Sequence, residues 1–428
     1  MENLQEEPSL SRKYSHSRLG RFPISTIFGG AAAMKLPRFG YVFVALLSFV
    51  ASIGHAQTPG VTDDTILLGQ SAAFGGPAAA LGKAMREGAM VYFDRVNAAG
   101  GVHGRKIKLI SLDDGYEPDR AIANTRKLIN EEKVFALFGY VGTPTSYAVK
   151  PIVTEAKIPF FGPFTGAEGL RNPVNRYIFN IRASYFDETE KLVDWMVADR
   201  KTNIAVFYQN DAYGKAGLEG VRRAMERRKL RISATGTVQR NTVDVADAVK
   251  SIAPAHPDAV IMISAYKSCA AFIKAFNKTR QRPIYMNVSF VGSKALADEL
   301  GPEGHGVIIS QVVPFPLYPW GAALEMRNLL AARSPDVKPS FNNVEGFLAA
   351  KGVVEGLRRA GRDLTREKFI TALETMRKVD LGAFPITFTP ESHSGSHFVE
   401  LTVIIGGGGK FPFLPLHRAG TKPLRASR

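Results

Sequence analysis

Two loops rich in hydroxyl and glycine residues follow short apolar runs of the chain. Residues 137–146 read LFGYVGTPTS and contain Thr143, and residues 163–166 read PFTG and contain Thr165. A loop of this kind before a helix can hold an anion through its backbone N–H groups. The first loop is therefore expected to bind a nucleotide phosphate, to bind a substrate carboxylate, or only to complete its own helix end.

A nucleotide phosphate is the weakest of these three interpretations. No G-x-x-x-x-G-K-[ST] motif occurs, and the loop has no lysine to meet a β- or γ-phosphate. The apolar run 66–71 is followed by AAFGGP, which lacks the third glycine of a dinucleotide fingerprint.

No set of side chains with the residue types and spacing of an active site can be assembled. His393 and His397 are four apart, but the SGS between them indicates a loop rather than a metal-binding helix face. Asp113 and Asp114 can be paired carboxylates, although a strand end before a turn explains them better, and Asp211 is better explained as a turn or cap residue. There is also no G-x-S-x-G motif. The sequence predicts no enzyme, no cofactor and no metal.

The elements around these loops alternate between strand and helix. Apolar runs of strand length are followed by helical periodicity in two successive sets, 60–181 and 182–313, which is typical of parallel sheets with helices on both faces. A helical remainder and a pair of strands, joined by the glycines at 406–409, follow. The predicted class is α/β, with ligands expected beyond the carboxyl ends of the strands.

The first 56 residues do not read as part of a domain. A basic stretch after Met34, an apolar run at 41–53 and small residues up to Ala56 indicate a signal peptide cleaved after Ala56. The apolar run is shorter than the roughly 20 residues that span a bilayer. Translation begins at Met1 or at Met34, and the protein is expected in the periplasm.

The overall charge and the single cysteine exclude two further classes of protein. The 428 residues carry a net charge of +16, but the basic residues are scattered over helices without aromatic spacing, so no nucleic-acid partner is expected. Cys269 is the only cysteine, which excludes an internal disulfide and a cysteine metal cluster.

Several stretches resemble the periplasmic substrate-binding proteins of branched-chain amino acid type ABC transporters, the leucine/isoleucine/valine-binding group. The matching stretches are ILLGQSAAFGGPAAALG (66–82), VNAAGGVHGRKIKLISLDDGYEP (96–118), ALFGYVGTPTSYAVKPI (136–152), IPFFGPFTGAEGLR (158–171), FNIRASYFDE (179–188), IAVFYQNDAYGKAGLEGV (204–221) and VEGFLAAKGVVEGLRRAG (344–361). The resemblance covers roughly residues 60–412.

The resemblance implies two Rossmann-like lobes, each a three-layer αβα sandwich, joined by three hinge crossovers near 182, 313 and 385. The expected parts are a leader and signal peptide (1–56), first-lobe segments (57–181 and 314–384), second-lobe segments (182–313 and 385–412) and a basic tail (413–428). Such a protein delivers a small ligand to a membrane permease and its ATPase. The alternative is a ligand sensor for a signalling receptor.

The resemblance also assigns residues to the ligand. The hydroxyls of Thr143 and Thr165, with nearby backbone N–H groups, are expected to hold a carboxylate, and Tyr213 is expected to line the site. Position alone suggests further aromatic walls: Phe164, Tyr140, Tyr185, Tyr266 and Phe74.

Ser289 is a departure from the family pattern. Counting back from Gly301 places it where leucine-type members carry an acid that pairs with the ligand ammonium. A serine supplies no charge, and a buried ammonium without an anion is costly. The expected ligand is therefore a small amino acid, carboxylate or amide, with Asp211 or Asp113 as substitutes for the missing acid.

Overall fold

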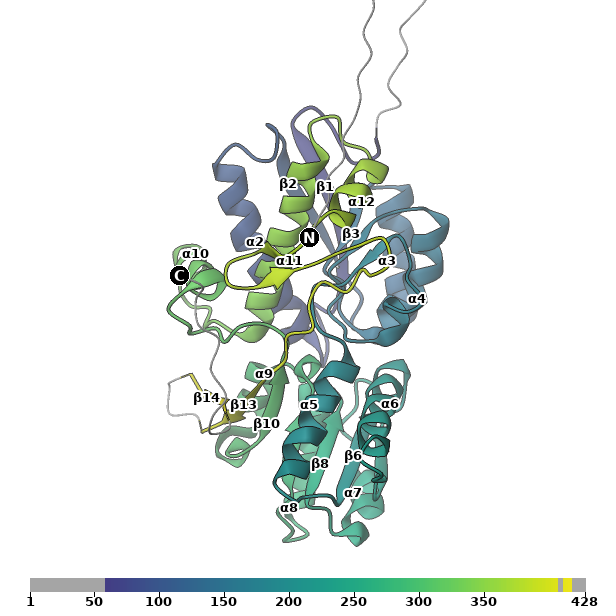
Figure 1. Cartoon of the computed structure of the whole chain (residues 1–428), viewed down its shortest axis with the longest axis vertical. Helices are drawn as coiled ribbons and strands as arrows, with labels where there is room; N and C mark the ends of the chain where they lie inside the picture. The colour runs from purple at the N-terminus through teal and green to yellow at the C-terminus, as the bar shows by residue number, and fades with distance from the viewer. Residues whose placement is uncertain (1–57, 407–410, 418–428) are drawn as a thin grey trace, which may run out of the picture. The chain divides into compact units, whose positions relative to one another are not determined.

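The computed structural model describes residues 58–406 and 411–417. The expected signal peptide, most of the glycine loop and the tail from residue 418 lie outside these residues. Two sheets with helices on both faces form two lobes (Figure 1), which confirms the predicted α/β class. We call the part around the first sheet the first lobe and the part around the second sheet the second lobe.

The first sheet has five parallel strands in the order β2-β1-β3-β4-β5. The strands are β1 (Thr65–Ala72), β2 (Lys106–Asp113), β3 (Ala136–Phe138), β4 (Phe160–Phe161) and β5 (Ile178–Phe179). Their side chains are mostly apolar and buried, as expected for strands that are covered on both faces. This order places the ends of β3 and β4 side by side.

Helices from distant parts of the chain cover the first sheet. They are α2 (Ala79–Ala98), α3 (Pro118–Asn130), α4 (Thr143–Glu155), η2 (Glu168–Leu170), α10 (Gly321–Arg333), α11 (Phe341–Ala360) and α12 (Arg366–Glu374). Helix α11 packs on α2 and α12, while α3 packs on α4. The helical segment after the second lobe thus packs on helices of the first lobe.

The second sheet has seven strands in the order β14-β13-β10-β9-β8-β6-β7. The strands are β6 (Ile204–Gln209), β7 (Thr235–Val238), β8 (Ala259–Ile263), β9 (Ile284–Asn287), β10 (Ile308–Gln311), β13 (Glu400–Ile404) and β14 (Phe413–Leu416). The first five are parallel, and the last two add antiparallel strands at the β10 edge.

The helices of the second lobe begin with well-defined caps where the sequence carries cap residues. They are α5 (Tyr185–Ala198), α6 (Ala212–Glu226), α7 (Ala246–Ile252), η3 (Ala253–Ala255), α8 (Tyr266–Asn277), η4 (Ser289–Val291), α9 (Ser293–Leu300) and η5 (Gly301–Gly304). Ser184 and Asp187 form a capping box at the start of α5, and Asp211 caps α6. No helix among the residues described is both long and apolar enough to cross a bilayer.

Two segments differ from the expected boundaries. Residues 385–395 stay with the first lobe, because β12 (Pro385–Ile386) pairs with β11 (Val379–Asp380), Phe388 packs on Phe179 of β5, and the Gly395 N–H donates to the Asn180 carbonyl. The third crossover therefore lies between 395 and β13, rather than near 385. Residues 413–416, which we expected in the basic tail, form β14, whose Phe413 is buried.

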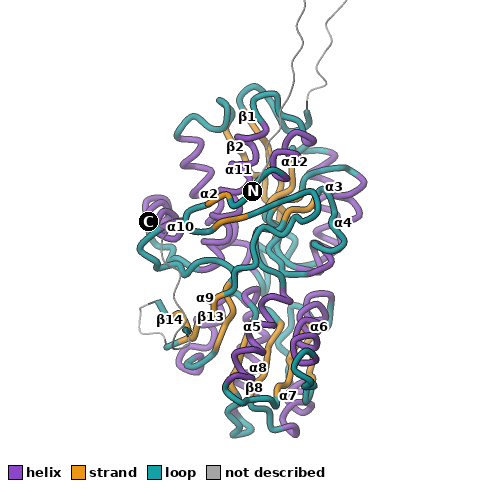
Figure 2. Tube along the Cα trace, in the orientation of Figure 1, coloured by secondary structure: helices purple, strands orange, loops and turns teal. Residues whose placement is uncertain are grey.

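Two glycines allow α2 and α11 to cross closely in the first lobe. A Cβ at Gly88 would collide with the Asn343 carbonyl, and a Cβ at Gly346 would collide with the Met85 carbonyl. The backbones are therefore in direct contact at this crossing, and no side chain separates them. The crossing fixes the first turn of α11 beside α2, and the two helices are labelled in the first lobe in Figure 2.

Candidate functional site

Thr143 and Thr165 lie side by side at the carboxyl edge of the first sheet. The loops after β3 and β4 are joined by a bridge between Val141 and Phe164, and the Gly142 N–H donates to the Phe164 carbonyl. This pairing puts the two hydroxyl oxygens 2.6 Å apart, and both side chains are fully buried. The sequence places both threonines after strands, and the adjacent order of β3 and β4 brings them together.

The Thr143 hydroxyl has no capping role. Gly142 is the N-cap residue of α4, with φ of 110°, and Thr143 is the first residue of the helix. A Cβ at position 142 would collide with the Tyr116 ring, so glycine is required there for space as well as for conformation. The Thr145 hydroxyl, not that of Thr143, bonds to the carbonyls of the loop.

Aromatic rings from both lobes surround the threonine pair. Thr165 Oγ1 donates to the Tyr185 hydroxyl at 3.3 Å, and the Tyr185 ring lies 5.4 Å from the Tyr213 ring. Phe290, in η4, is the centre of the group. Its ring lies within 6 Å of three others: Tyr213 (4.5 Å), Phe164 (5.4 Å) and Tyr116 (5.8 Å). The lobes thus meet through aromatic rings directly beside the hydroxyl pair.

Three buried charged side chains lie behind the aromatic group. Arg182, on the first crossover, forms ion pairs with Glu188 at 3.1 Å and with Glu345 at 3.4 Å. Its guanidinium also lies 4.9 Å from the centre of the Phe164 ring and bonds to the Ser289 hydroxyl. Burial raises the pKa of Glu345 to about 7, although the positive charge of Arg182 opposes the shift.

Ser289 is close to an acid, but not to either acid proposed as a substitute. Its N–H donates to Glu188 Oε2 at 2.7 Å. Asp211 accepts from two N–H groups at the start of α6, and Asp113 accepts from the N–H groups of Phe74, Gly75 and Gly115. Both aspartates therefore serve local backbone structure, and Glu188 is the carboxylate beside Ser289.

The predicted site residues divide into one group and three outliers. Those brought together are Thr143, Thr165, Phe164, Tyr185, Tyr213 and Ser289. Tyr140 lies instead in the core of the first lobe, where its ring packs on Phe160 and its hydroxyl bonds to Thr125. Phe74 is partly exposed beneath Arg86, and Tyr266 is buried at the start of α8. Tyr140 lies two residues after the end of β3, and its side chain packs into the core rather than toward the threonine pair.

Sequence analysis missed Phe290, Tyr116, Arg182, Glu188 and Glu345. Phe290 directly follows Ser289, so a search for aromatic residues next to the expected polar position would have found it. Arg182 and Glu188 are only six residues apart, but Glu345 is distant in the sequence, and only the return of the chain to the first lobe brings it to Arg182.

A row of polar contacts joins the lobes at the rim of the site. Arg240 of the second lobe pairs with Glu117 of the first at 2.6 Å, and Asn241 donates to Glu117 at 2.7 Å and to the Gly115 carbonyl at 3.1 Å. Gln209 donates to the Tyr116 hydroxyl at 3.2 Å. The lobes are therefore in contact, and the threonine pair is enclosed between them.

These features define a two-lobed α/β protein of the type I periplasmic binding class. A family model described as periplasmic binding protein matches residues 65–409, and the chain belongs to that family. The resemblance noted from the sequence is thereby confirmed.

Solved structures and curated relatives agree with this assignment. A possible leucine/isoleucine/valine-binding protein from Rhodopirellula baltica is 34% identical, with a TM-score of 0.78, over 83% of this chain and 96% of that one. A substrate-binding periplasmic protein from Ralstonia solanacearum is 31% identical, with a TM-score of 0.77, over 82% of this chain and all of that one. Leu/Ile/Val-binding protein homolog 7 of Brucella abortus is 27% identical over 60% of this chain and 66% of its own length.

Proposed function

We propose that this protein captures a small carboxylate-bearing solute, an amino acid or a related acid or amide, between its lobes and delivers it to the permease of an ABC importer. The observation that carries the proposal is the hydroxyl pair of Thr143 and Thr165 at the start of α4, enclosed by aromatic rings from both lobes. The periplasm is the proposed location, and the relatives named above are binding proteins rather than enzymes.

The chemistry of the enclosed group supports a carboxylate ligand. The Thr143 and Thr165 hydroxyls can turn their protons toward an anion, and the first N–H groups of α4 have no partner within the helix. Ser146, in the first turn of α4, is buried, and its hydroxyl has no partner within the described chain. The Tyr213 hydroxyl is likewise buried without a partner there, so it can meet a ligand from the second lobe.

The position of Glu188 bears on the choice between an amino acid and a simple acid. Glu188 accepts from Ser289 N–H and from Ser310 Oγ at 2.6 Å, and it is paired with Arg182. A ligand ammonium has to compete with that arginine for the carboxylate, whereas an acid or amide without an ammonium does not. Both ligand classes therefore belong in the binding test.

A thermal-shift and calorimetric screen of the purified protein tests the proposal. The panel is L-leucine, L-valine, aromatic acids, short amides and sugars. A ligand present at a hundred times its Kd should stabilise the fold by about 2.7 kcal/mol. The Thr143→Ala, Thr165→Ala double variant should weaken binding of that ligand at least tenfold.

Thr371→Ala, on the exposed face of α12, is the matched control and should leave Kd unchanged. A panel in which no compound stabilises the protein would contradict the transport function. A double variant that binds as tightly as the natural protein would contradict the assigned site and leave the transport function standing.

A further inference from the structure

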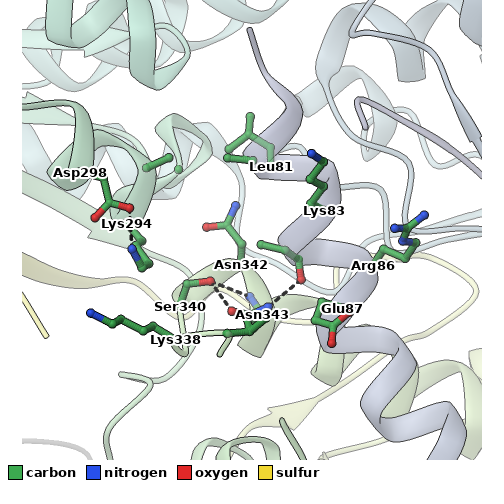
Figure 3. A pocket seen from close by; sticks show the side chains of 15 residues that line it. Leu81, Lys83, Arg86, Glu87, Lys294, Asp298, Lys338, Ser340, Asn342 and Asn343 are labelled. Atoms are coloured by element: carbon green, nitrogen blue, oxygen red, sulfur yellow. Dashed lines mark hydrogen bonds and ion pairs between the residues drawn. The ribbon is translucent and has the colours of Figure 1, made fainter. Parts of the chain in front are cut away.

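A second pocket lies at the border of the lobes, away from the threonine pair. Its volume is about 370 Å³, and it is lined by α2, by the start of α9 and by residues 337–343 (Figure 3). Helix α2 and residues 337–343 belong to the first lobe, while α9 belongs to the second. The lobes are in close contact beside it, since a Cβ at Gly292 would collide with the Leu81 side chain. A molecule held in this pocket therefore contacts both lobes.

Three helices begin at the wall of this pocket. Helix α2 begins at Ala79, α9 at Ser293 and α11 at Phe341, and the first turn of each contributes lining residues. Some of their first N–H groups already have partners, since Ala79 and Leu81 donate to nearby carbonyls and Asn343 donates to the Ser340 hydroxyl, but each helix end still carries a partial positive charge. Three such ends around one space favour an anion.

The ionic side chains of the pocket carry an excess of positive charge. Its two acids are already paired: Glu87 with Arg333 at 2.7 Å, and Asp298 with Lys294 at 2.5 Å. Lys83 and Lys338 are exposed, and neither has an acidic partner among the residues that the structure describes. Two ammonium groups at the rim are thus left without a counter-ion.

The buried side chain of Asn342 gives the independent sign of a ligand. Asn342 is 5% exposed and lines the pocket, and its Nδ2 has no hydrogen-bond partner in the described chain. Figure 3 shows its amide directed into the open space between Lys294 and Leu81. The neighbouring Asn343 differs, because its Nδ2 donates to the Ala84 carbonyl at 3.0 Å. A buried donor without an acceptor costs about 1–3 kcal/mol, so an acceptor is expected here.

We propose that this pocket is an oxyanion site, in which the Asn342 amide and the helix N-termini hold a carboxylate or phosphate group while Lys83 and Lys338 neutralise its charge. Because both lobes line it, an anion bound there favours the arrangement in which the lobes touch. The oxyanion is either a free anion or a second acidic group on the ligand of the threonine site.

Two arms of one experiment separate these sources. In the first arm, inorganic phosphate is titrated into the protein at constant ionic strength, with chloride as the replaced anion, and binding is followed by calorimetry and melting temperature. In the second arm, glutarate is compared with butyrate, two acids of similar chain length that differ in the second carboxylate. If the pocket binds a free anion, phosphate should bind and raise the melting temperature. If it binds a second acidic group of the ligand, the protein should bind glutarate at least tenfold more tightly than butyrate.

Two variants test the pocket: the single variant Asn342→Ala and the double variant Lys83→Gln, Lys338→Gln. Each should raise the Kd of the bound anion at least fivefold. Lys127→Gln, an exposed lysine of α3, is the matched control and should have no effect. The two lysines are exposed, so the double variant should fold like the natural protein. It therefore still tests the pocket if Asn342→Ala fails to fold.

The outcomes are distinct from those of the threonine site. Phosphate binding that survives Thr143→Ala, Thr165→Ala but is lost in the pocket variants supports the proposal even if no transported ligand is found. The absence of any phosphate response, together with equal binding of glutarate and butyrate, overturns it and assigns a water molecule to the Asn342 amide.

Discussion

At the level of single residues, Arg182 joins the lobes by forming ion pairs with one acid from each. It is buried with Glu188 from α5 and Glu345 from α11, one from each side of the border. A buried charge needs partners of opposite sign, and one arginine shared between two acids leaves one carboxylate incompletely balanced. The raised pKa of Glu345 is the result of that imbalance and of its burial.

Glu345→Gln should change how stability depends on pH. The pKa of Glu345 rises from 4.5 in the unfolded chain to about 7 in the folded protein. The folded state therefore retains a proton that the unfolded state releases, and stability falls as pH rises from about 4.5 to 7. Glutamine has no such proton, so the stability of the variant relative to the natural protein should increase through this window, by at most about 1.4 kcal/mol per pH unit.

Denaturant unfolding at several pH values between 4.5 and 7.5 measures this effect. Asp114, whose pKa burial raises to about 6, contributes a slope of the same sign in both proteins and cancels in the comparison. Glu355→Gln is the control, because Glu355 lies on the same helix in a surface pair with Arg359. Parallel stability curves for Glu345→Gln and the natural protein would disprove the assignment.

Among the elements, α11 has the largest role in shaping the border between the lobes. Its first turn lines the oxyanion pocket, its next turn carries Glu345, and its contact with α2 depends on Gly88 and Gly346. Small residues at a helix crossing let backbones meet, and any Cβ there needs a backbone shift. The position of α11 is thus fixed by glycine rather than by interlocking side chains.

Gly346→Ala should destabilise the fold by roughly 1–3 kcal/mol, the usual cost of overpacking. Its Cβ meets backbone atoms of α2, whereas the Cβ of Gly352→Ala, on the same helix, meets only the side chains of Ile181 and Phe161. Both variants gain the same helix propensity, of about 1 kcal/mol. Thermal unfolding should therefore show a lower melting temperature for Gly346→Ala than for Gly352→Ala, and the reverse order would refute the close crossing.

The element level also shows how far the sequence alone could lead. Strand and helix alternation predicted the two sheets, because hydrophobic periodicity is local. The pair β11–β12 was missed because two-residue strands carry little periodic signal. The strand pair around the glycines at 406–409 was predicted, but its addition to the second sheet depends on the contact of β13 with β10, a distant segment of the chain. Local periodicity was enough to place Thr143 and Thr165 after strands. The contact of Arg182 with Glu345 could not be predicted, because it depends on the path of the chain between the lobes.

For the whole molecule, the contacts between lobes determine how readily it opens. Arg240 and Asn241 of the second lobe hold Glu117 of the first, and the Arg240 side chain is about one-quarter exposed. Each pair of this kind stabilises the contact by about 0.2–1 kcal/mol. Together they bias the molecule toward the arrangement in which the lobes touch, without contacting the threonine pair.

Arg240→Ala and Glu117→Gln should each weaken ligand binding roughly 2–5-fold, mainly through faster dissociation, because the closed arrangement becomes less populated. The double variant should lose less than the sum of the two single losses, since both changes remove the Arg240–Glu117 pair, although each residue has a further partner, Asp211 for Arg240 and Asn241 for Glu117. Calorimetry measures the Kd, and stopped-flow release measures the dissociation rate. Arg223→Ala serves as the control, since its partner Glu219 lies on the same helix. Additive losses in the double variant would show that the two residues act separately.

The enclosure of the threonine pair has a consequence for timing. Thr143, Thr165 and the rings around them are buried while the lobes touch. A molecule held there has no exit until the lobes separate, so its release requires that motion. Ligands that contact both lobes should then have longer residence times than ligands that contact the threonine pair alone, because their contacts have to break as the lobes separate.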